Sequence, residues 1–360
     1  MFHYLITLTP LGLLYGSAGG FLSPENLVGR SQAKFPPDSG AFAGLLLDAK
    51  QRSHQDIDKK KLTVAGPFWT HDDLWAGRDR DFFVPLPRTK VVGKQPGDFD
   101  TWRFDRNANP ETGRVWKRDP KKEDLQSDYT WVQLHNWESK AQDLNRDGAR
   151  GTNVRQAPWT FVPMLHPWMK ADERCVQETG GLFLEQAVRM DDGVRLVYAS
   201  TEALADGWYK FGGENHLVET ECVEIDETHK LNALLSQEIG DSFAIVTPAI
   251  WGSNRRSLRH PHDGCDTARP EAPPLSPFPY RALLTDKPVP FRFRSGGQDR
   301  SDGQERPGRL GRGRYAIKAG SVYVLSEARS DNWWQWERWF PREGFSLQRL
   351  GCGLALPMPV

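Results

Sequence analysis

The chain has 360 residues, a length that suits two domains with cores of ordinary size. Its 47 lysines and arginines balance its 47 aspartates and glutamates, which excludes a global attraction to nucleic acid or membranes, so any basic surface must be local. Fourteen tryptophans, 33 glycines and 26 prolines exclude a helical bundle and indicate a loop-rich, aromatic-rich protein.

The four cysteines are scattered along the chain, at Cys175, Cys222, Cys265 and Cys352. None forms a C-x-x-C pair, which argues against a zinc ribbon or redox motif and fits a reducing cytoplasm. The N-terminal segment is apolar, but it lacks a positively charged start and Pro10 interrupts it. A strand at residues 2–9 is therefore favoured over a signal peptide. Because no apolar run reaches about 18 residues, we expect no membrane span and a cytoplasmic protein.

The first helix is predicted at residues 39–52, with Asp38 or Ser39 as its N-cap, directly after Phe35-Pro36-Pro37. Its first turn carries glycine and small residues, which leaves backbone N–H groups open to an anion or to another backbone. Residues 66–160 are rich in Trp, Arg, Lys and Asp, poor in aliphatic residues and interrupted by turn signals. This composition indicates long hairpins or an insertion carried on a core.

Aliphatic alternation returns at residues 182–200, where Asp191-Asp192-Gly193 marks a hairpin turn. Residues 331–340 are aromatic at near-helical spacing. Further strands are predicted within the segments 207–226, 242–252, 320–325 and 343–357. Strands and helices mix without a regular βαβ repeat, which favours an α+β fold.

Two segments contain residues of metal-ligand type. Asp143, Asn145, Asp147 and Gly148 stand at the offsets of a calcium loop, but the twelfth position is Val154 and not a bidentate glutamate. A polar turn is therefore favoured.

The second segment, "HPHDGCD", places His260, His262 and Cys265 within residues 260–266. Its spacing matches no ligand pattern and its Pro and Gly indicate a loop, so a solvated loop is favoured over a metal site. No G-x-S-x-G, Walker A or H-E-x-x-H motif occurs, and we expect no cofactor, no metal and no catalytic residue.

Two segments contain residue types that can bind nucleic acid. Residues 292–314 interleave arginine with glycine, which permits close backbone approach to phosphates while arginine supplies bidentate contacts; the alternative is a solvated loop. The tryptophans of 331–340 can stack on bases. However, Trp333, Trp336 and Trp339 fall on one helical face, which favours a core position.

Six blocks in order resemble the third subunit of the Cmr (type III-B) CRISPR effector complexes, a RAMP protein that caps the 5′ end of the guide RNA. They are "FPPDSGAFAGLLLDA", "GPFWTHDDLWAGRDRDFFVPLPR", "FGGENHLVE", "LLTDKPVPF", "RYAIKAGSVYVL" and "GFSLQRLGCGLALP". The chain departs from the family where Asn215 and His216 follow the Gly-Gly-Glu block and where the Arg/Gly run replaces a Gly-Trp-Asp segment.

The resemblance implies two ferredoxin-like (RRM-like) modules. The first would span residues 1–235 with a thumb inserted at about 66–160, and the second residues 236–360 with the basic loop 292–314. It also implies a non-catalytic subunit that holds the 5′ handle of the guide RNA (crRNA) and contacts the large cyclase-bearing subunit and a backbone RAMP subunit.

In this interpretation the RNA is held by backbone N–H groups, basic side chains and thumb aromatics. The expected RNA-binding residues are Arg30, Lys34, Ser39, Gly40, Lys50, Arg52, Trp102, Arg103, Trp131, Arg309, Arg312, Arg314, Gly344, Gly351 and Gly353. Two alternatives stay open at this point. One is a metal-independent guide-processing ribonuclease that uses a histidine such as His216 with a nearby lysine, and the other is a scaffold without RNA contact.

Overall fold

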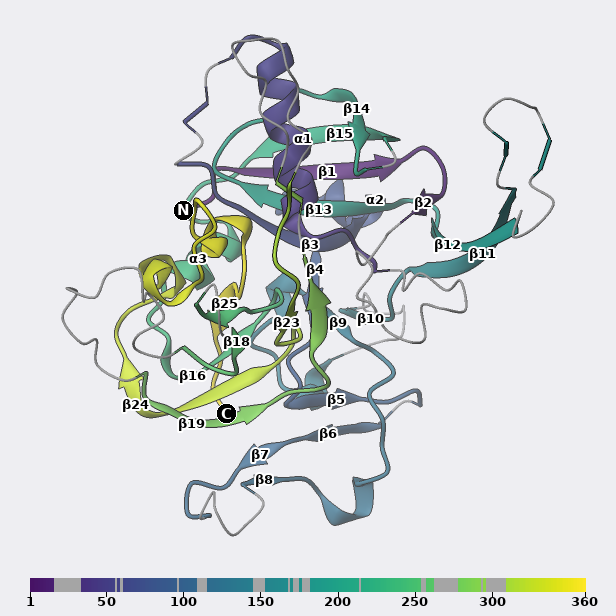
Figure 1. Ribbon diagram of the computed structural model, residues 1–360. Coiled ribbons are helices and arrows are strands. Elements are labelled where there is room, and N and C mark those ends of the chain that lie inside the picture. The colour runs from purple at the N-terminus through teal and green to yellow at the C-terminus, as the bar shows by residue number, and fades with distance from the viewer. Residues whose placement is uncertain are drawn as a thin grey trace.

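The computed structural model describes residues 1–15, 34–55, 57–58, 61–95, 97–108, 115–144, 153–167, 169–170, 175–176, 182–213, 215–253, 257–261, 278–292, 294–295 and 309–360. These residues form a mixed, strand-rich fold with few helices, in which two main sheets lie side by side (Figure 1). This agrees with the predicted mixture of strands and helices.

The larger sheet has eight strands in the order β10-β9-β4-β3-β13-β1-β15-β14. Strand β1 (Tyr4–Pro10) pairs antiparallel with β13 and β15, and β3 pairs antiparallel with β13. The first strand was therefore predicted correctly. The remaining bounds are β3 (Val64–His71), β4 (Phe83–Pro85), β9 (Trp131–Gln133), β10 (Val154–Arg155), β13 (Val194–Ser200), β14 (Gly207–Phe211) and β15 (His216–Glu224).

Helix α1 (Ser39–Arg52) has the predicted bounds, with Asp38 at its N-cap, and covers one face of this sheet (Figure 1). Its apolar positions recur at helical spacing, so Phe42 and Leu46 face the sheet and are fully buried. Phe42 stacks on Tyr198 of β13 with ring centroids 4.7 Å apart. The helix is thus held by its buried face and not by a side-chain N-cap, which Asp38 does not provide.

The smaller sheet has four strands in the order β19-β24-β16-β25, all antiparallel. If these four strands are numbered by their position in the sequence, their order across the sheet is second, third, first, fourth. The four central strands of the larger sheet, β3-β13-β1-β15, have the same order. The bounds are β16 (Gly240–Ile245), β19 (Tyr280–Leu284), β24 (Val322–Arg329) and β25 (Ala355–Pro357). Helix α3 (Lys230–Ser236) precedes β16.

The connection from β24 to β25 contains three 3₁₀ helices, η5 (Trp333–Gln335), η6 (Glu337–Trp339) and η7 (Leu347–Leu350). Trp333, Trp336 and Trp339 are at most 1% exposed, which confirms that this aromatic segment is core. The same core cluster contains Phe68 of the larger sheet and Phe243 of the smaller one, so the two sheets share one hydrophobic core.

The remaining elements are short ribbons and turns. The pair β5–β6 and the pair β7–β8 form a projection at one end of the molecule, and the long hairpin β11–β12 extends sideways (Figure 1). Their bounds are β5 (Lys90–Val92), β6 (Phe99–Thr101), β7 (Arg103–Phe104), β8 (Trp116–Lys117), β11 (Trp159–Pro167), β12 (Leu182–Met190) and, paired with β12, β2 (Leu14–Tyr15). Others are α2 (Asp72–Trp75), η2 (Pro120–Lys122), η3 (Leu134–Asn136), η4 (Ala141–Asp143), β17 (Trp251–Gly252), β18 (Ser257–Leu258), β20 (Val289–Phe291), β21 (Arg294–Ser295), β22 (Arg309–Leu310) and β23 (Arg314–Ala316).

Part of the segment 66–160 belongs to the core, whereas the sequence predicts long hairpins or an insertion carried on the core. Strand β3 lies inside the larger sheet, and Trp69, Phe83 and Val132 are fully buried. The sequence signal failed here because burial in this region relies on tryptophan and phenylalanine, while the expectation counted aliphatic residues. Among the described residues of this segment, the β7–β8 ribbon has the character predicted for the whole, whereas Val91 and Val92 of β5 are buried. In the described part of the chain, no helix is long and apolar enough to cross a membrane.

Candidate nucleic-acid interface

A groove of about 910 Å³ is lined by residues of the larger sheet and of segments that flank the strands of the smaller sheet. We call it the central groove. Its walls come from segments 34–38, 85–91, 118–131, 246–248, 286–290 and 318–319, together with Pro67, Trp102 and Phe161. Four of the six sequence blocks that carry the family resemblance contribute here. One contributes Phe35-Pro36-Pro37-Asp38, the next both Gly66-Pro67 and Pro85-Leu86-Pro87-Arg88, and the other two Lys287-Pro288-Val289-Pro290 and Lys318-Ala319. Segments more than 200 residues apart thus meet at one surface.

The described lining of the central groove has five cationic side chains and three carboxylates, a net charge of +2 in a chain whose total charge is zero. The cations are Lys34, Arg88, Lys90, Arg118 and Lys318, and the carboxylates are Asp38, Glu123 and Asp286. The local basic surface that the balanced composition requires is therefore present here. A groove with such a lining concentrates anions more than the rest of the surface does.

Trp102 is one of two tryptophans in the central groove, and its position is fixed from behind by Arg118. The guanidinium carbon of Arg118 lies 5.3 Å from the centroid of a Trp102 ring. The Arg118 side chain is only 8% exposed, pairs with Asp100 at 2.7 Å and donates to the carbonyl of Lys122 at 2.7 Å. Trp102 is thus an aromatic platform on a rigid support, which suits stacking on a base.

Trp131 is the second tryptophan of the groove. It packs edge-on against Trp159 and Trp69, with ring centroids 5.7 and 6.2 Å away. Both predicted tryptophans therefore lie at the same groove. Arg103, predicted beside Trp102, is exposed on β7 and is not among the lining residues.

Lys90 is a lining residue that the sequence did not single out. It is 8% exposed, and its Nζ donates to the carbonyl oxygen of Trp137. Burial lowers the pKa of Lys90 to about 8, and the nearby carboxylate of Glu138 opposes this shift only in part. The groove wall thus contains a lysine that loses its proton close to neutral pH.

The start of α1 lies at the groove, but it is less open than expected. Lys34 lines the groove and pairs with Asp38. Ser39 is buried, and its hydroxyl donates to the carbonyl oxygen of Leu350, so it packs the helix against η7. Gly40 is half-buried in the first turn. The Ser39 side chain therefore acts in packing, and the contact of the backbone N–H groups of this helix start with an anion stays a prediction.

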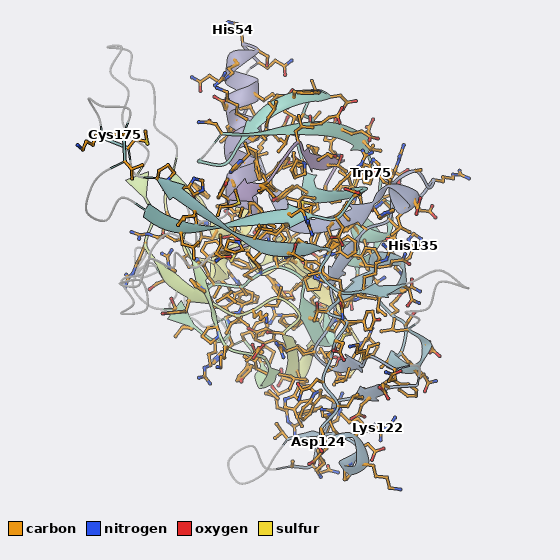
Figure 2. The ribbon with its side chains drawn as sticks, turned by 90° about the vertical axis from the view of Figure 1, so that its right-hand side faces the viewer. His54, Trp75, Lys122, Asp124, His135 and Cys175 are labelled. Atoms are coloured by element: carbon orange, nitrogen blue, oxygen red, sulfur yellow. The ribbon has the colours of Figure 1, made fainter. Side chains whose placement is uncertain are left out.

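Lys50 and Arg52 belong to the last turn of α1, about 20 Å from its start at 1.5 Å per residue. Lys50 donates to Gln55 at 2.9 Å, and Arg52 pairs with Asp48 at 2.8 Å. His54, which follows the helix, lies at the opposite end of the molecule from Lys122 of the projection (Figure 2). The structure therefore does not bring these two cations to the central groove.

The three candidate arginines of the basic run have different surroundings. Arg314 is 4% exposed and pairs with Glu343, which argues against its expected contact with phosphate and also against the alternative of a solvated loop at this residue. Arg312 is exposed. Arg309 belongs to β22, with a side chain outside the described part, and Arg30 lies outside the described residues altogether.

Two of the three predicted glycines near the C-terminus have packing roles. A Cβ at Gly351, whose φ is +66°, would lie 2.5 Å from the Cα of Ala65 in β3. Gly353, with φ +59°, is buried between Ala249 and Phe340. Both positions require glycine for close packing in the core, which corrects their expected exposure to phosphate. Gly344 is exposed, and a Cβ there would meet no neighbouring atom within 4 Å.

The two described histidines that the sequence singled out, His216 and His260, have packing contacts. The Nε2 atom of His216 accepts the backbone N–H of Tyr15 at 3.1 Å, and the two rings stack. His260 stacks on Tyr280 with centroids 4.2 Å apart. Among the described residues, no group of three His, Cys, Asp or Glu side chains is placed to hold a metal ion. His262, Cys265, Asn145, Asp147 and Gly148 lie outside the described residues.

The sequence missed Arg88, Lys90, Arg118 and Lys318 as groove residues. Arg88 and Lys318 stand inside blocks that carry the family resemblance, at the ends of Pro-Leu-Pro-Arg and Ala-Ile-Lys, and this is the signal that would have found them. Arg118 and Lys90 carry no comparable signal.

Comparison with solved structures gives similar chains of low sequence identity. A chain of "Cryo-EM structure of the Type III-B Cmr-beta bound to cognate target RNA and AMPPnP, state 1" is 14% identical, with 89% of this chain and 86% of that chain covered and a TM-score of 0.44. A chain of the Csm3–Csm4 subcomplex in the type III-A CRISPR-Cas interference complex is 9% identical, with 91% and 97% covered and a TM-score of 0.37. A chain of the Csm1–Csm4 cassette in complex with pppApA is 12% identical, with 90% and 87% covered and a TM-score of 0.30.

No curated protein matches the sequence. The family model described as CRISPR-associated protein (Cas_Cmr3) matches residues 20–359, which is nearly the whole chain. The match confirms the resemblance that the six sequence blocks predict. The chain therefore belongs to the Cas_Cmr3 family of CRISPR-associated proteins.

Proposed function

We propose that the protein is a non-catalytic, guide-RNA-binding subunit of a cytoplasmic type III CRISPR effector complex and that its central groove holds the single-stranded 5′ handle of the guide RNA. One observation carries the proposal: four family blocks from distant parts of the chain converge on a groove that combines cations with two tryptophans. Single-stranded nucleic acid is bound by this combination, because cations neutralise the backbone and aromatic rings stack on bases.

The roles within the groove follow from the contacts. Trp102, supported by Arg118, stacks on one base, and Trp131 offers a second aromatic surface. Lys34, Arg88 and Lys318 lie on the wall and neutralise phosphates. These cations position the strand, and the bases are read by other contacts.

We further propose that each main sheet is the core of a ferredoxin-like module. Both sheets have the antiparallel order second, third, first, fourth that this module requires. In the first, α1 connects β1 to β3, and the segment from β4 to β12 is an insertion between β3 and β13. In the second, η5, η6 and η7 replace the helix between β24 and β25. The proposed modules span residues 1–235 and 236–360.

The partners that we propose are the large cyclase-bearing subunit and a backbone RAMP subunit of the same complex. The support comes from the family and from similar chains that were solved as a Csm1–Csm4 cassette and a Csm3–Csm4 subcomplex. Co-purification of the tagged protein from its host, followed by sequencing of the bound RNA, tests the assignment. Short RNAs with a shared repeat-derived 5′ end are expected, and random RNA fragments would contradict it.

Trp102→Ala tests the groove directly. We expect this change to weaken binding of a short single-stranded RNA by roughly tenfold, because one stacked base contributes about 1–3 kcal/mol. Trp102→Phe should retain most of the affinity because it keeps an aromatic face. The matched control is Trp208→Ala, which removes a tryptophan that is 63% exposed on β14 and does not line the groove. Equal losses in Trp102→Ala and Trp208→Ala, measured by fluorescence anisotropy, would show that the RNA binds elsewhere.

The same RNA is expected to remain intact during incubation with the protein in EDTA. Cleavage that His216→Ala abolishes would instead support the ribonuclease alternative.

A further inference from the structure

Two cations of the central groove share a single carboxylate oxygen. Arg88 follows β4, Lys318 precedes β24, and both reach the Oδ2 atom of Asp286, which lies between β19 and β20. Arg88 pairs with Oδ2 through Nη2, and the Nζ of Lys318 lies 3.3 Å from the same oxygen. The three side chains thus form a small cluster, contributed by both proposed modules, in which two positive charges face one negative charge.

The cluster has hydrogen-bonding capacity that Asp286 does not use. The Nε atom of Arg88 is buried and has no acceptor among the described residues. An arginine fork donates two parallel hydrogen bonds to a phosphate or carboxylate, whereas here Arg88 bonds Asp286 through Nη2. A group that presents one acceptor oxygen to Nε and another to Nη2 therefore satisfies this site better than Asp286 does here.

The two cations stand on a fixed backbone. The N–H of Arg88 donates to the carbonyl of Gly320 at 2.8 Å. Gly320 has φ +84°, and a Cβ there would lie 2.8 Å from the carbonyl oxygen of Leu86, so only glycine permits this close contact. Lys318 belongs to the same turn, where the Ser321 hydroxyl donates to its carbonyl at 2.6 Å. The backbone positions of Arg88 and Lys318 are thus set by contacts that do not involve Asp286.

Asp286, in contrast, is replaceable. Its side chain is 41% exposed, so its ion pairs are of the exposed type that contributes little free energy. The backbone N–H of Lys287 and the charges of Arg88 and Lys318 hold the pKa of Asp286 below its usual value, so the carboxylate is ionised at neutral pH. It can rotate into solvent when another anion takes its place, and no covalent bond changes.

We propose that Arg88 and Lys318 form a subsite for one phosphate of the bound RNA and that Asp286 occupies this subsite in the free protein. The inference rests on the proposed function. It adds that the Asp286 carboxylate competes with one RNA phosphate for Arg88 and Lys318. Free anions and short strands must displace Asp286 with few other contacts, so they bind weakly. A strand that also stacks on Trp102 binds well. The phosphate belongs either to a phosphodiester within the strand or to a terminal 5′ phosphate.

Asp286→Asn is the test, because it removes the competing charge with little change in shape. We measure dissociation constants by fluorescence anisotropy for one short single-stranded RNA, made with a 5′-hydroxyl and with a 5′-phosphate. The expected result is a roughly fivefold tighter complex, the size of effect that weak exposed ion pairs give. A gain with both RNAs identifies an internal phosphodiester, and a gain with the 5′-phosphate RNA alone identifies the terminal group.

Glu123→Gln is the matched control. Glu123 is an exposed carboxylate of the same groove, and the charge change is the same. Its gain should stay below twofold, because general charge effects are screened by salt near 0.15 M. In the background of Lys318→Met, the gain from Asp286→Asn should be reduced, because half of the subsite is missing. An equal gain in Glu123→Gln, or a gain that survives unchanged in the Lys318→Met background, would overturn the proposal.

Asp286 has a competing interpretation as a purely structural link between the two proposed modules. In that case Asp286→Asn leaves RNA affinity unchanged or lowers it together with the melting temperature, and either result overturns the phosphate subsite. Lys318→Met alone gives an independent measurement, with a salt slope that is expected to flatten by about 0.7. If the wild-type protein binds RNA but these variants do not differ from it, the inference alone fails. If the wild-type protein binds no RNA, the proposed function fails as well.

Discussion

Lys90 provides a quantitative test of the groove because its charge is costly to bury. Its pKa falls from an ordinary value of 10.5 to about 8 through burial. A difference of about 2.5 pKa units corresponds to roughly 3 kcal/mol between the folded and unfolded states. We therefore compare the wild-type protein with Lys90→Met, which keeps the length and apolar character of the side chain but has no charge.

The sign of the effect follows from proton binding. Between about pH 8 and pH 10.5 the unfolded chain binds a proton at Lys90 and the folded protein does not, so the stability of the wild-type protein rises with pH. The free-energy penalty for burying the charged form of Lys90 is fully present below pH 8 and disappears as the pH approaches 10.5. Relative to Lys90→Met, the wild-type protein should gain roughly 2 kcal/mol between pH 7 and pH 9.5. The loss of the hydrogen bond to Trp137 shifts this difference by an amount that depends little on pH.

Urea denaturation of both proteins at four pH values measures the free energies of unfolding. Taking the difference between the two proteins cancels the other groups that titrate in this range. A constant difference across pH would refute the argument, because it would mean that Lys90 is solvated in the folded state.

RNA binding gives a second measurement: a phosphate in the groove favours protonated Lys90, so RNA affinity should fall above pH 8 in the wild-type protein and less in Lys90→Met.

Two further predictions concern residues that the sequence placed at RNA and the structure places in the core. Gly351→Ala should lower the melting temperature more than Gly344→Ala, because both have positive φ but only Gly351 meets neighbouring backbone; equal shifts in thermal unfolding would contradict the packing role. Arg314→Met should destabilise the fold by about 3–5 kcal/mol, because it leaves Glu343 without its buried partner, whereas Arg312→Met should change stability little. Similar denaturation midpoints for these two arginine variants would show that Arg314 is solvated.

The parts of the fold that could be predicted have local signals. Helix α1 follows a Pro-Pro-Asp-Ser start and has apolar residues at helical spacing, so its bounds could be assigned from the sequence. The tryptophans of 331–340 were assigned to the core correctly, but their helices are 3₁₀. Trp333, Trp336 and Trp339 are three residues apart, the spacing at which side chains align on a 3₁₀ helix, and this could have indicated the type.

The central groove could not be derived from local signals. Arg88, Asp286 and Lys318 come from three distant segments, and contacts between the connecting segments of the two sheets bring them together. Arg312 and Arg314 have the same composition around them, yet one is exposed and the other buried. Strand β23 alternates its side chains between core and solvent, so Arg314 and Ala316 face inward and Tyr315 faces outward. Charge alone therefore predicted the wrong surroundings for Arg314.

The wall of the central groove indicates how its chemistry differs from a glycine-lined phosphate site. Five prolines line it, at Pro36, Pro67, Pro85, Pro248 and Pro290. Proline has no backbone N–H, so these wall positions offer carbonyl oxygens and ring surfaces to a ligand but no amide donors. In the proposed function, side chains such as Arg88 and Lys318 therefore bind the phosphates at these positions, and proline and tryptophan surfaces remain for bases and sugars. Such a lining suits an extended strand held by a few charged contacts between apolar surfaces, whereas Gly351 and Gly353 act in packing.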